Sequence, residues 1–191
     1  MPDYKSKNYN YLGKRIFDLI LAILGLAILT PLMAIVAFMI QLTLGSPVIY
    51  RQTRPGINGN LFTFYKFRTM YAGSDKSSIT VGNDDPRITP IGRFLRKYKL
   101  DELPQLFNVL KGDMSIVGPR PDVPKYKEHY LRHFKDYYKM KPGITGYASL
   151  YFADEAELYK NVPDPEKVYI LKIIPKKVEL DKKYYKEMSL L

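Results

Sequence analysis

Two adjacent carboxylates, Asp101 and Glu102, are the residues of this sequence best suited to chemistry. Pro104 follows them, and proline fits only within the first turn of a helix, so both acidic residues are expected at a helix N-terminus. The helix should end at Lys111, with Gly112 directly after it. Because a helix N-terminus favours anions and lowers the pKa of a carboxyl group, both side chains are expected to be ionised at neutral pH.

Neighbouring carboxylates repel each other unless a cation lies between them. The 191-residue sequence has no cysteine and two histidines. An oxygen-ligated hard cation such as Mg²⁺ therefore fits best, usually shared with the phosphates of a substrate. His129 and His133 are four positions apart with no third ligand evident, so we expect them at an interface rather than in a metal site.

Basic residues flank the acidic pair on both sides. They are Arg93, Arg96, Lys97, Lys99 and, between Pro119 and Pro121, Arg120. A carboxylate pair beside such cations is what phosphoryl transfer needs: one carboxylate attacks or binds metal, and the cations neutralise the transferring phosphate. Charge alone leaves a second interpretation open, in which Asp101 caps a helix, Glu102 is solvated and the cations form a basic helix face.

The elements that must position these residues are visible in the flanking sequence. Ile91, Phe94, Leu95 and Tyr98 recur at helical spacing, which predicts a helix directly before the acidic pair. Upstream, PVIYRQTRPGINGNLFTFYKFRTM predicts a β-hairpin that turns at its Asn-Gly dipeptide. Two basic residues of its second strand could face either the site or lipid headgroups: Lys66 and Arg68.

The remaining segments give weaker signals. Residues 72–86 are polar and predict a loop, which would be a lid or a linker. Residues 123–140 predict an amphipathic, basic, tyrosine-rich helix, and the last third is expected to hold a turn at 141–143 and two or three short helices. We expect three charged residues near the polar loop to set a turn rather than to bind a ligand: Asp84, Asp85 and Arg87.

A long apolar segment, Ile16 to Leu44, precedes all of these elements. No charged residue occurs between Leu19 and Ile40, and a helix of this length could cross a hydrocarbon core of about 30 Å. Thr30-Pro31 interrupts the segment, because proline has no N–H and clashes with the preceding turn. No small-residue cleavage site follows, so we expect the segment to stay in the mature protein and to meet lipid.

The flanks of this apolar segment are basic at both ends. The residues are Lys5, Lys7, Lys14 and Arg15 before it, and Arg51, Arg54, Lys66 and Arg68 after it. A single membrane span should be asymmetric in Lys and Arg. Basic residues at both ends instead favour a re-entrant helix–break–helix, which turns at Thr30-Pro31 and leaves on the face that it entered. The Thr30 hydroxyl is placed to accept a hydrogen bond at the break. A proline-kinked single span is the alternative.

The net charge of +11 suits anionic partners: acidic lipid headgroups, nucleotide phosphates or nucleic acid. Several segments together resemble the bacterial sugar transferases, the monotopic polyprenyl-phosphate phosphoglycosyl transferases that begin membrane glycan assembly. The segments are KRIFDLILAILGLAILTP, GSPVIYRQTRPGINGNLFTFYKFRTM, DPRITPIGRFLRKYKLDELPQLFNVLKGDMSIVGPRP and KPGITG. They occur in the family's order from Lys14 to Gly146, and the chain is similar to the small form of the family.

The resemblance implies transfer of a sugar-1-phosphate from a UDP-sugar to undecaprenyl phosphate, with release of UMP, through a phosphosugar bound covalently to an aspartate. It makes Asp101 the nucleophile and Glu102 its acidic partner, with Mg²⁺ at the pair. It also implies a re-entrant helix on the cytoplasmic face of the bacterial inner membrane. The family's helix is broken at a Ser-Pro pair, and this chain has Thr30-Pro31 instead, which keeps the hydroxyl and the proline. Further residues match family positions: Arg96 and Arg120 as phosphate contacts, Gly143 and Gly146 in a loop near the nucleotide, and Asp181.

The sequence departs from the family pattern after KPGITG, where many members continue with Trp-Ala-Gln and this chain has Tyr147-Ala148-Ser149-Leu150. We expect residues beyond this point to distinguish the donor sugar, so the sequence does not identify that sugar. It does not give the oligomeric state either, for which a homodimer is one option. Two competing functions are a membrane-anchored basic module for anionic lipid or nucleic acid, and a single-span receptor. Under the leading hypothesis no nucleic acid partner is expected.

The expected fold class is α/β, mostly α. Residues 1–44 would form a lead-in and the re-entrant membrane helix, and residues 45–191 a compact helical catalytic domain with a β-hairpin.

Overall fold

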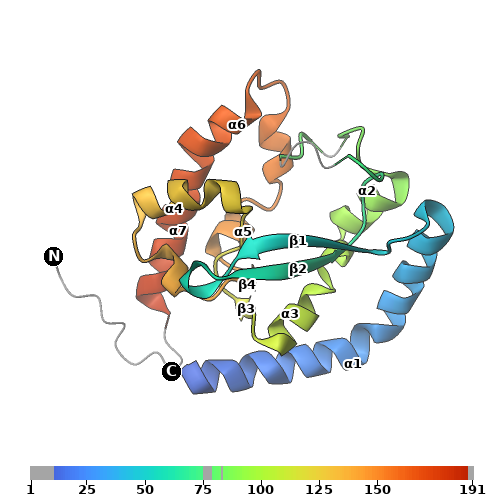
Figure 1. Cartoon of the computed structure of the whole chain (residues 1–191), viewed down its shortest axis with the longest axis horizontal. Helices are drawn as coiled ribbons and strands as arrows, with labels where there is room; N and C mark the ends of the chain where they lie inside the picture. Colours follow the sequence, from blue (N-terminus) through green and yellow to red (C-terminus); the bar gives the residue numbers. More distant parts are fainter. Residues whose placement is uncertain (1–10, 75–78, 83, 189–191) are drawn as a thin grey trace.

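The computed structural model describes residues 11–74, 79–82 and 84–188. Its largest element is helix α1, Tyr11–Leu44, of 34 residues. Within the described residues this is the one helix long and apolar enough to cross a membrane, and 11% of its most apolar window is buried inside the protein. Figure 1 shows α1 running along the lower edge of the molecule and then turning sharply upward.

The turn in α1 is a bend within one helix, not the interruption that we predicted. The backbone stays helical through Pro31, which cannot donate to the carbonyl four residues earlier. The Thr30 hydroxyl donates to the Leu26 carbonyl at 2.5 Å, so it is a donor here and not the expected acceptor. Hydroxyl bonds of this type to residue i−4 also bend helices.

Both ends of α1 are tied to the rest of the chain. Near its start, the buried carboxylate of Asp18 accepts hydrogen bonds from the Lys14 ammonium, the Ser115 hydroxyl (3.1 Å) and the Ile116 N–H (3.0 Å). At its other end, the Arg68 guanidinium donates to the carbonyls of Leu44, Gly45 and Ser46. The two arms of the bent helix therefore face one and the same body.

The predicted β-hairpin is confirmed. Strand β1, Ile49–Pro55, pairs antiparallel with β2, Leu61–Phe67, in the register Ile49↔Phe67 to Pro55↔Leu61. The connection contains Asn58 and Gly59 with positive φ angles of 56° and 75°, which explains the Asn-Gly sequence because both residue types tolerate this region. A second sheet, two short parallel strands, was not predicted: β3, Ser115–Val117, and β4, Gly143–Thr145.

The helix predicted directly before the acidic pair is α2, Pro90–Lys97, which the Thr89 hydroxyl caps by accepting from the Gly92 N–H. The helix after the pair is α3, Gln105–Lys111, and Gly112 follows it with φ 94°, as expected for a helix C-terminus.

The single helix predicted over residues 123–140 is wrong. The chain instead forms the 3₁₀ turn η3, Pro124–Tyr126, helix α4, Lys127–His133, and the 3₁₀ turn η4, Tyr137–Lys139. The interruption is Phe134, which is extended at φ −152° and lets both Tyr130 and Tyr137 enter the core.

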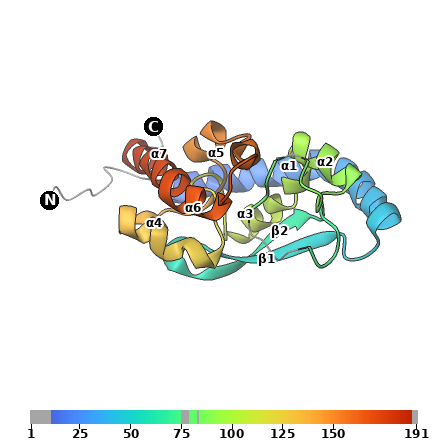
Figure 2. The same cartoon turned by 90° about the horizontal axis from the view of Figure 1, so that it is seen from above.

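The last third is more helical than predicted. Its elements are α5, Tyr147–Tyr151; η5, Glu155–Tyr159; α6, Pro165–Val168; the π-helical turn η6, Tyr169–Ile173; and α7, Ile174–Glu187. In Figure 2, α1, α2, α5 and α7 lie along one side of the molecule, and the β1–β2 hairpin and α4 lie along the other.

Buried side chains form three clusters. A tyrosine-rich cluster packs α4, η4, η6 and α7 together. The second arm of α1 packs Met33, Val36 and Ile40 against Phe67 and Leu95. The first arm packs Ala22 against Phe64, Val109 and Met114. The mostly helical α/β class is confirmed, and α1 is part of the packed core even though its outer face is exposed and apolar.

We predict that Asp18→Ala lowers the free energy of unfolding by about 3 kcal/mol, because it leaves the Lys14 ammonium and the Ile116 N–H without their buried acceptor. Thermal unfolding in detergent measures the change. Glu179→Ala is the matched control, since its ion pair with Lys176 is exposed and should be worth no more than about 0.5 kcal/mol. Equal effects of the two variants would contradict the proposed anchoring role of Asp18.

Candidate active site

The acidic pair lies on a tight turn between α2 and α3. Lys99 has φ 56° and ψ 20°, a left-handed conformation unusual for lysine, and the 3₁₀ turn η2, Leu100–Glu102, follows directly. Pro104 takes the N-cap position of α3. The predicted placement of both carboxylates at the start of a helix is thus confirmed, with one short turn between them and the first residue of α3.

The Glu102 carboxylate is held by a bidentate ion pair. The two terminal nitrogens of Arg120 donate to its two oxygens at 2.8 and 2.5 Å. Burial alone would raise the pKa of Glu102, but the charge and hydrogen bonds of Arg120 outweigh burial and lower this pKa. Glu102 is therefore ionised at neutral pH, as predicted, and fixes the orientation of the arginine.

The Asp101 carboxyl behaves differently from its neighbour. It is 4% exposed, and burial, with the adjacent Glu102 charge, raises its pKa in spite of Lys66, Arg96 and Arg120. The predicted lowering of this pKa is thus wrong, because loss of hydration outweighs the position of Asp101 before a helix. Its Oδ1 atom has no hydrogen-bond partner among the residues that the structure describes.

Three of the predicted cations converge on Asp101 from three different elements. Lys66 comes from β2, Arg96 from α2, and Arg120 from the loop after β3, and all three act electrostatically on the Asp101 carboxyl. Burial, followed by the Arg96 charge, lowers the pKa of Lys66 to about 8, against the opposing effect of Asp101. The Arg96 side chain is held by its Nε, which donates to the Thr69 hydroxyl at 3.0 Å.

Arg68, the fourth predicted substrate contact, is not brought to this site. It is buried, and its guanidinium is bound to the carbonyls at the end of α1. Alternation along a strand does not explain the difference between Lys66 and Arg68, because residues two positions apart share a face. Arg68 lies beyond the last residue of β2, Phe67, where the strand has ended.

The loop that carries Arg120 is rigid for identifiable reasons. Its base is fixed by the parallel pairing of β3 and β4: the Gly118 N–H donates to the Thr145 carbonyl and the Gly143 N–H to the Pro119 carbonyl, both at 2.8 Å. A Cβ on Gly143 would lie 2.1 Å from the Gly118 nitrogen. The predicted importance of Gly143 thus has a physical cause, the close approach of two backbones that hold the Arg120 loop.

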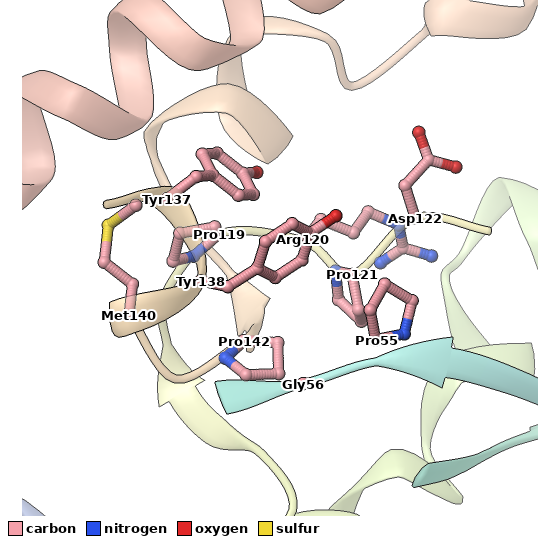
Figure 3. A pocket seen from close by; sticks show the side chains of 10 residues that line it. All are labelled: Pro55, Gly56, Pro119, Arg120, Pro121, Asp122, Tyr137, Tyr138, Met140 and Pro142. Carbon is pink, nitrogen blue, oxygen red and sulfur yellow. The ribbon is translucent and has the colours of Figure 1, made fainter. Parts of the chain in front are cut away.

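Figure 3 shows this loop beside a small cavity, with Arg120 between Pro119 and Pro121 and the Tyr138 ring next to it. The end of β1 closes the other side through Pro55 and Gly56. These rings and prolines leave the arginine backbone little freedom to move.

A residue that the sequence analysis placed only in the basic flank of the apolar segment supports the Arg120 loop. Arg54 on β1 donates to the Pro121 carbonyl and, at 3.0 and 2.6 Å, to the Gln52 side chain. Burial lowers the pKa of Arg54, and the Asp122 charge opposes this shift. The wholly cationic charge of the hairpin was the available signal, but the sequence gives no sign of which cation faces the loop.

A buried tyrosine network extends from Asp122, which was also missed. The Asp122 carboxylate accepts hydrogen bonds from Tyr130, at 3.1 Å, and from Tyr169. Lys177 donates to the Tyr169 hydroxyl at 3.1 Å and forms an ion pair with Glu155 at 2.6 Å. These contacts join the Arg120 loop to η5, η6 and α7.

The other predicted residues lie outside this cluster. Asp85 sets a turn, as predicted, by accepting from the Val81 and Arg87 N–H groups and from the Arg87 guanidinium, while Asp84 pairs with Lys160 at 3.3 Å. Asp181 is buried beneath α5 and accepts from the Tyr137 hydroxyl at 2.8 Å.

The two histidines lie on and at the end of α4. Among the described residues no group of three or more His, Cys, Asp or Glu side chains could hold a metal ion. A metal at Asp101 and Glu102 would therefore need further ligands from substrate or water.

The chain is similar to several known proteins. The family model described as bacterial sugar transferase matches residues 9–191. The UDP-glucose:undecaprenyl-phosphate glucose-1-phosphate transferase of Escherichia coli strain K12 is 40% identical over 191 residues, which cover 98% of this chain and 39% of the relative. The undecaprenyl-phosphate galactose phosphotransferase of Salmonella typhimurium strain LT2 is 45% identical over 149 residues, 70% of this chain and 31% of the relative.

A third relative is closer in length. An uncharacterized sugar transferase of Bacillus subtilis strain 168 is 44% identical over 137 residues, covering 72% of this chain and 67% of the relative. The family model spans almost the whole sequence, so the resemblance seen in the motifs is confirmed. The chain belongs to the bacterial sugar transferase family.

Proposed function

We propose that this chain is a phosphoglycosyl transferase, which moves a sugar-1-phosphate from a UDP-sugar to undecaprenyl phosphate and releases UMP. The main support is the site itself: the buried Asp101 carboxyl lies among Lys66, Arg96 and Arg120, and Glu102 fixes Arg120. The names of the Escherichia coli and Salmonella relatives support the same reaction class. Since these names differ in the sugar, the donor sugar stays open.

The reaction would proceed in two displacements at one phosphorus. In the first, an oxygen of the Asp101 carboxylate attacks the phosphorus that bears the sugar, and the bond from this phosphorus to the bridging oxygen breaks, so that UMP leaves with the electron pair. In the second, a phosphate oxygen of undecaprenyl phosphate attacks the same phosphorus and the Asp101 carboxylate is released. Each step forms one P–O bond and breaks one.

The surrounding cations suit both displacements. A diphosphate brings negative charge close to the carboxylate, which would repel the attack. Lys66, Arg96 and Arg120 offset this charge, and because they come from rigid elements they need little rearrangement when the phosphate oxygens arrive. The same three cations oppose the rise in the pKa of Asp101 that burial causes, which favours the ionised carboxylate that the first displacement needs.

The residues present also fit a Mg²⁺ ion. Mg²⁺ at phosphate-transfer sites is commonly held by one or two carboxylates together with substrate phosphates and water. Asp101 Oδ1 is buried with no hydrogen-bond partner in the described part of the chain, and the Glu102 oxygens keep lone pairs beyond those used by Arg120. Asp101 and Glu102 would hold the ion, which when bound neutralises charge on the diphosphate.

We further infer that α1 enters one leaflet and returns to the same face, the cytoplasmic face of the bacterial inner membrane. Its outer face carries exposed apolar side chains along both arms, among them Ile20, Ile28, Ile35 and Phe38. Its two ends are bonded through Asp18 and Arg68 to one body. A straight span would separate these ends by the thickness of the bilayer, so the attachment of both ends to one body supports the re-entrant path.

The covalent route predicts that Asp101→Asn lowers turnover at least about 10³-fold, because the variant lacks the nucleophile. Release of UMP from UDP-glucose and UDP-galactose, with radiolabelled transfer to undecaprenyl phosphate, measures turnover, and intact mass detects the phosphosugar on the protein. Asp136→Asn is the control, since this aspartate forms an exposed ion pair with Lys139. Full activity in the Asp101 variant would exclude the covalent mechanism, and a basic binding module would release no UMP in any variant.

The metal site predicts that chelation with EDTA abolishes turnover and that Mg²⁺ restores it. Paramagnetic resonance of Mn²⁺ gives a readout independent of activity. Wild-type protein with UMP should bind Mn²⁺, and Glu102→Gln should weaken this binding at least about tenfold by removing one anionic ligand. Undiminished turnover in EDTA would argue against a required cation.

The membrane path predicts the accessibility of engineered cysteines, for which the cysteine-free chain is well suited. A re-entrant α1 leaves Lys5→Cys and Met188→Cys on the same side, so an impermeant maleimide should label both in inverted membrane vesicles and neither in intact spheroplasts. Labelling of position 5 in spheroplasts, with position 188 protected, would instead establish a single span.

A further inference from the structure

Gln105, the first residue of α3, is an unusual polar residue beside the proposed nucleophile. It is 0% exposed, and neither Oε1 nor Nε2 has a hydrogen-bond partner among the described residues. Asp101, four positions earlier, is 4% exposed, and its Oδ1 atom also has no hydrogen-bond partner among the described residues. Buried polar groups are normally paired, because leaving them unpaired costs the whole of their lost hydration.

Asp101 and Gln105 are joined by a continuous run of helical turns. Consecutive turns continue from η2 into α3, with the Glu102 N–H donating to the Lys99 carbonyl and the Leu106 N–H to the Leu103 carbonyl. Long side chains on a helix point back toward its N-terminus. By this rule the Gln105 amide extends toward the turn that carries Asp101, and the two side chains are not hydrogen-bonded to each other in the described structure. The two groups are complementary, because the amide nitrogen donates hydrogen bonds and a carboxylate accepts them.

A second buried amide on α3 shows what a purely structural residue does there. Asn108 donates to the Thr63 carbonyl at 2.7 Å and accepts from the Tyr65 N–H at 3.1 Å, so it joins α3 to β2. Gln105 lies three positions earlier, on the same face of the helix, and makes no such bond in the described structure. An apolar side chain would stabilise the fold better at this buried position. The polar amide of Gln105 therefore indicates a role in the active site.

We propose that Gln105 is a positioning residue for Asp101: its amide N–H holds the carboxylate, directly or through one water molecule, in the orientation from which an oxygen attacks phosphorus. The inference rests on the proposed phosphosugar transfer. An uncharged donor suits this task, since it orients the carboxylate without competing for the phosphate. Lys66, Arg96 and Arg120 then remain available to the diphosphate.

The test compares Gln105→Met, which keeps the length of the side chain but removes the amide, with the wild-type full chain in detergent. Loss of a hydrogen bond to a charged group should slow single-turnover release of UMP about 10- to 100-fold. The KM for UDP-glucose or UDP-galactose, whichever the wild type turns over, should change less than about threefold. The melting temperature should stay the same or rise, because an unpaired buried amide has been removed.

Asn108→Leu is the matched control: it should lower the melting temperature, because its bonds to β2 are lost, and leave single-turnover release within about threefold of wild type below that temperature. Gln105→Asn, with a shorter amide, should be slow like Gln105→Met. A wild-type rate in either Gln105 variant would overturn the proposal, as would failure of Gln105→Met to fold, which would make the amide structural. Absence of UMP release from the wild type with every UDP-sugar would instead refute the proposed function.

Discussion

The removal of Asp101 from water is the constraint on which the rest of the site depends. A buried carboxyl next to a second carboxylate resists ionisation, as the raised pKa of Asp101 reflects. Cations from β2, α2 and the loop after β3 stabilise the charged form of this carboxyl. One of them, Arg120, also forms an ion pair with Glu102. Two of these cations are held by other residues: the Thr69 hydroxyl holds Arg96, and the β3–β4 pairing with Arg54 holds the Arg120 loop.

These supports explain why so small a chain needs so many connections. Arg120 depends on backbone contact between Gly118 and Gly143, segments 25 positions apart in the sequence. Asp122, two residues further, is bound by Tyr130 and Tyr169 from separate elements. The cation cluster therefore assembles only when the hairpin, the helical pair and the last third of the chain are all in place.

Sequence reasoning predicted the features that depend on local rules. The hairpin follows from Asn58-Gly59 and the end of α3 from Gly112. The position of the acidic pair just before α3 follows from Pro104. Features that depend on distant partners were missed or wrong. The β3–β4 pair is too short to leave a pattern, residues 123–140 break where tyrosines enter the core, and the pKa of Asp101 is decided by burial that no local pattern reveals.

The attachment of both ends of α1 has a consequence for the lipid around it. With Asp18 and Arg68 fixing the arms, the helix cannot slide or tilt without carrying Asp101 along. In a re-entrant arrangement, hydrophobic mismatch between the bent helix and a leaflet would then displace the nucleophile relative to the headgroup phosphates. Acyl chain length would act on catalysis mechanically, with no lipid touching the active site.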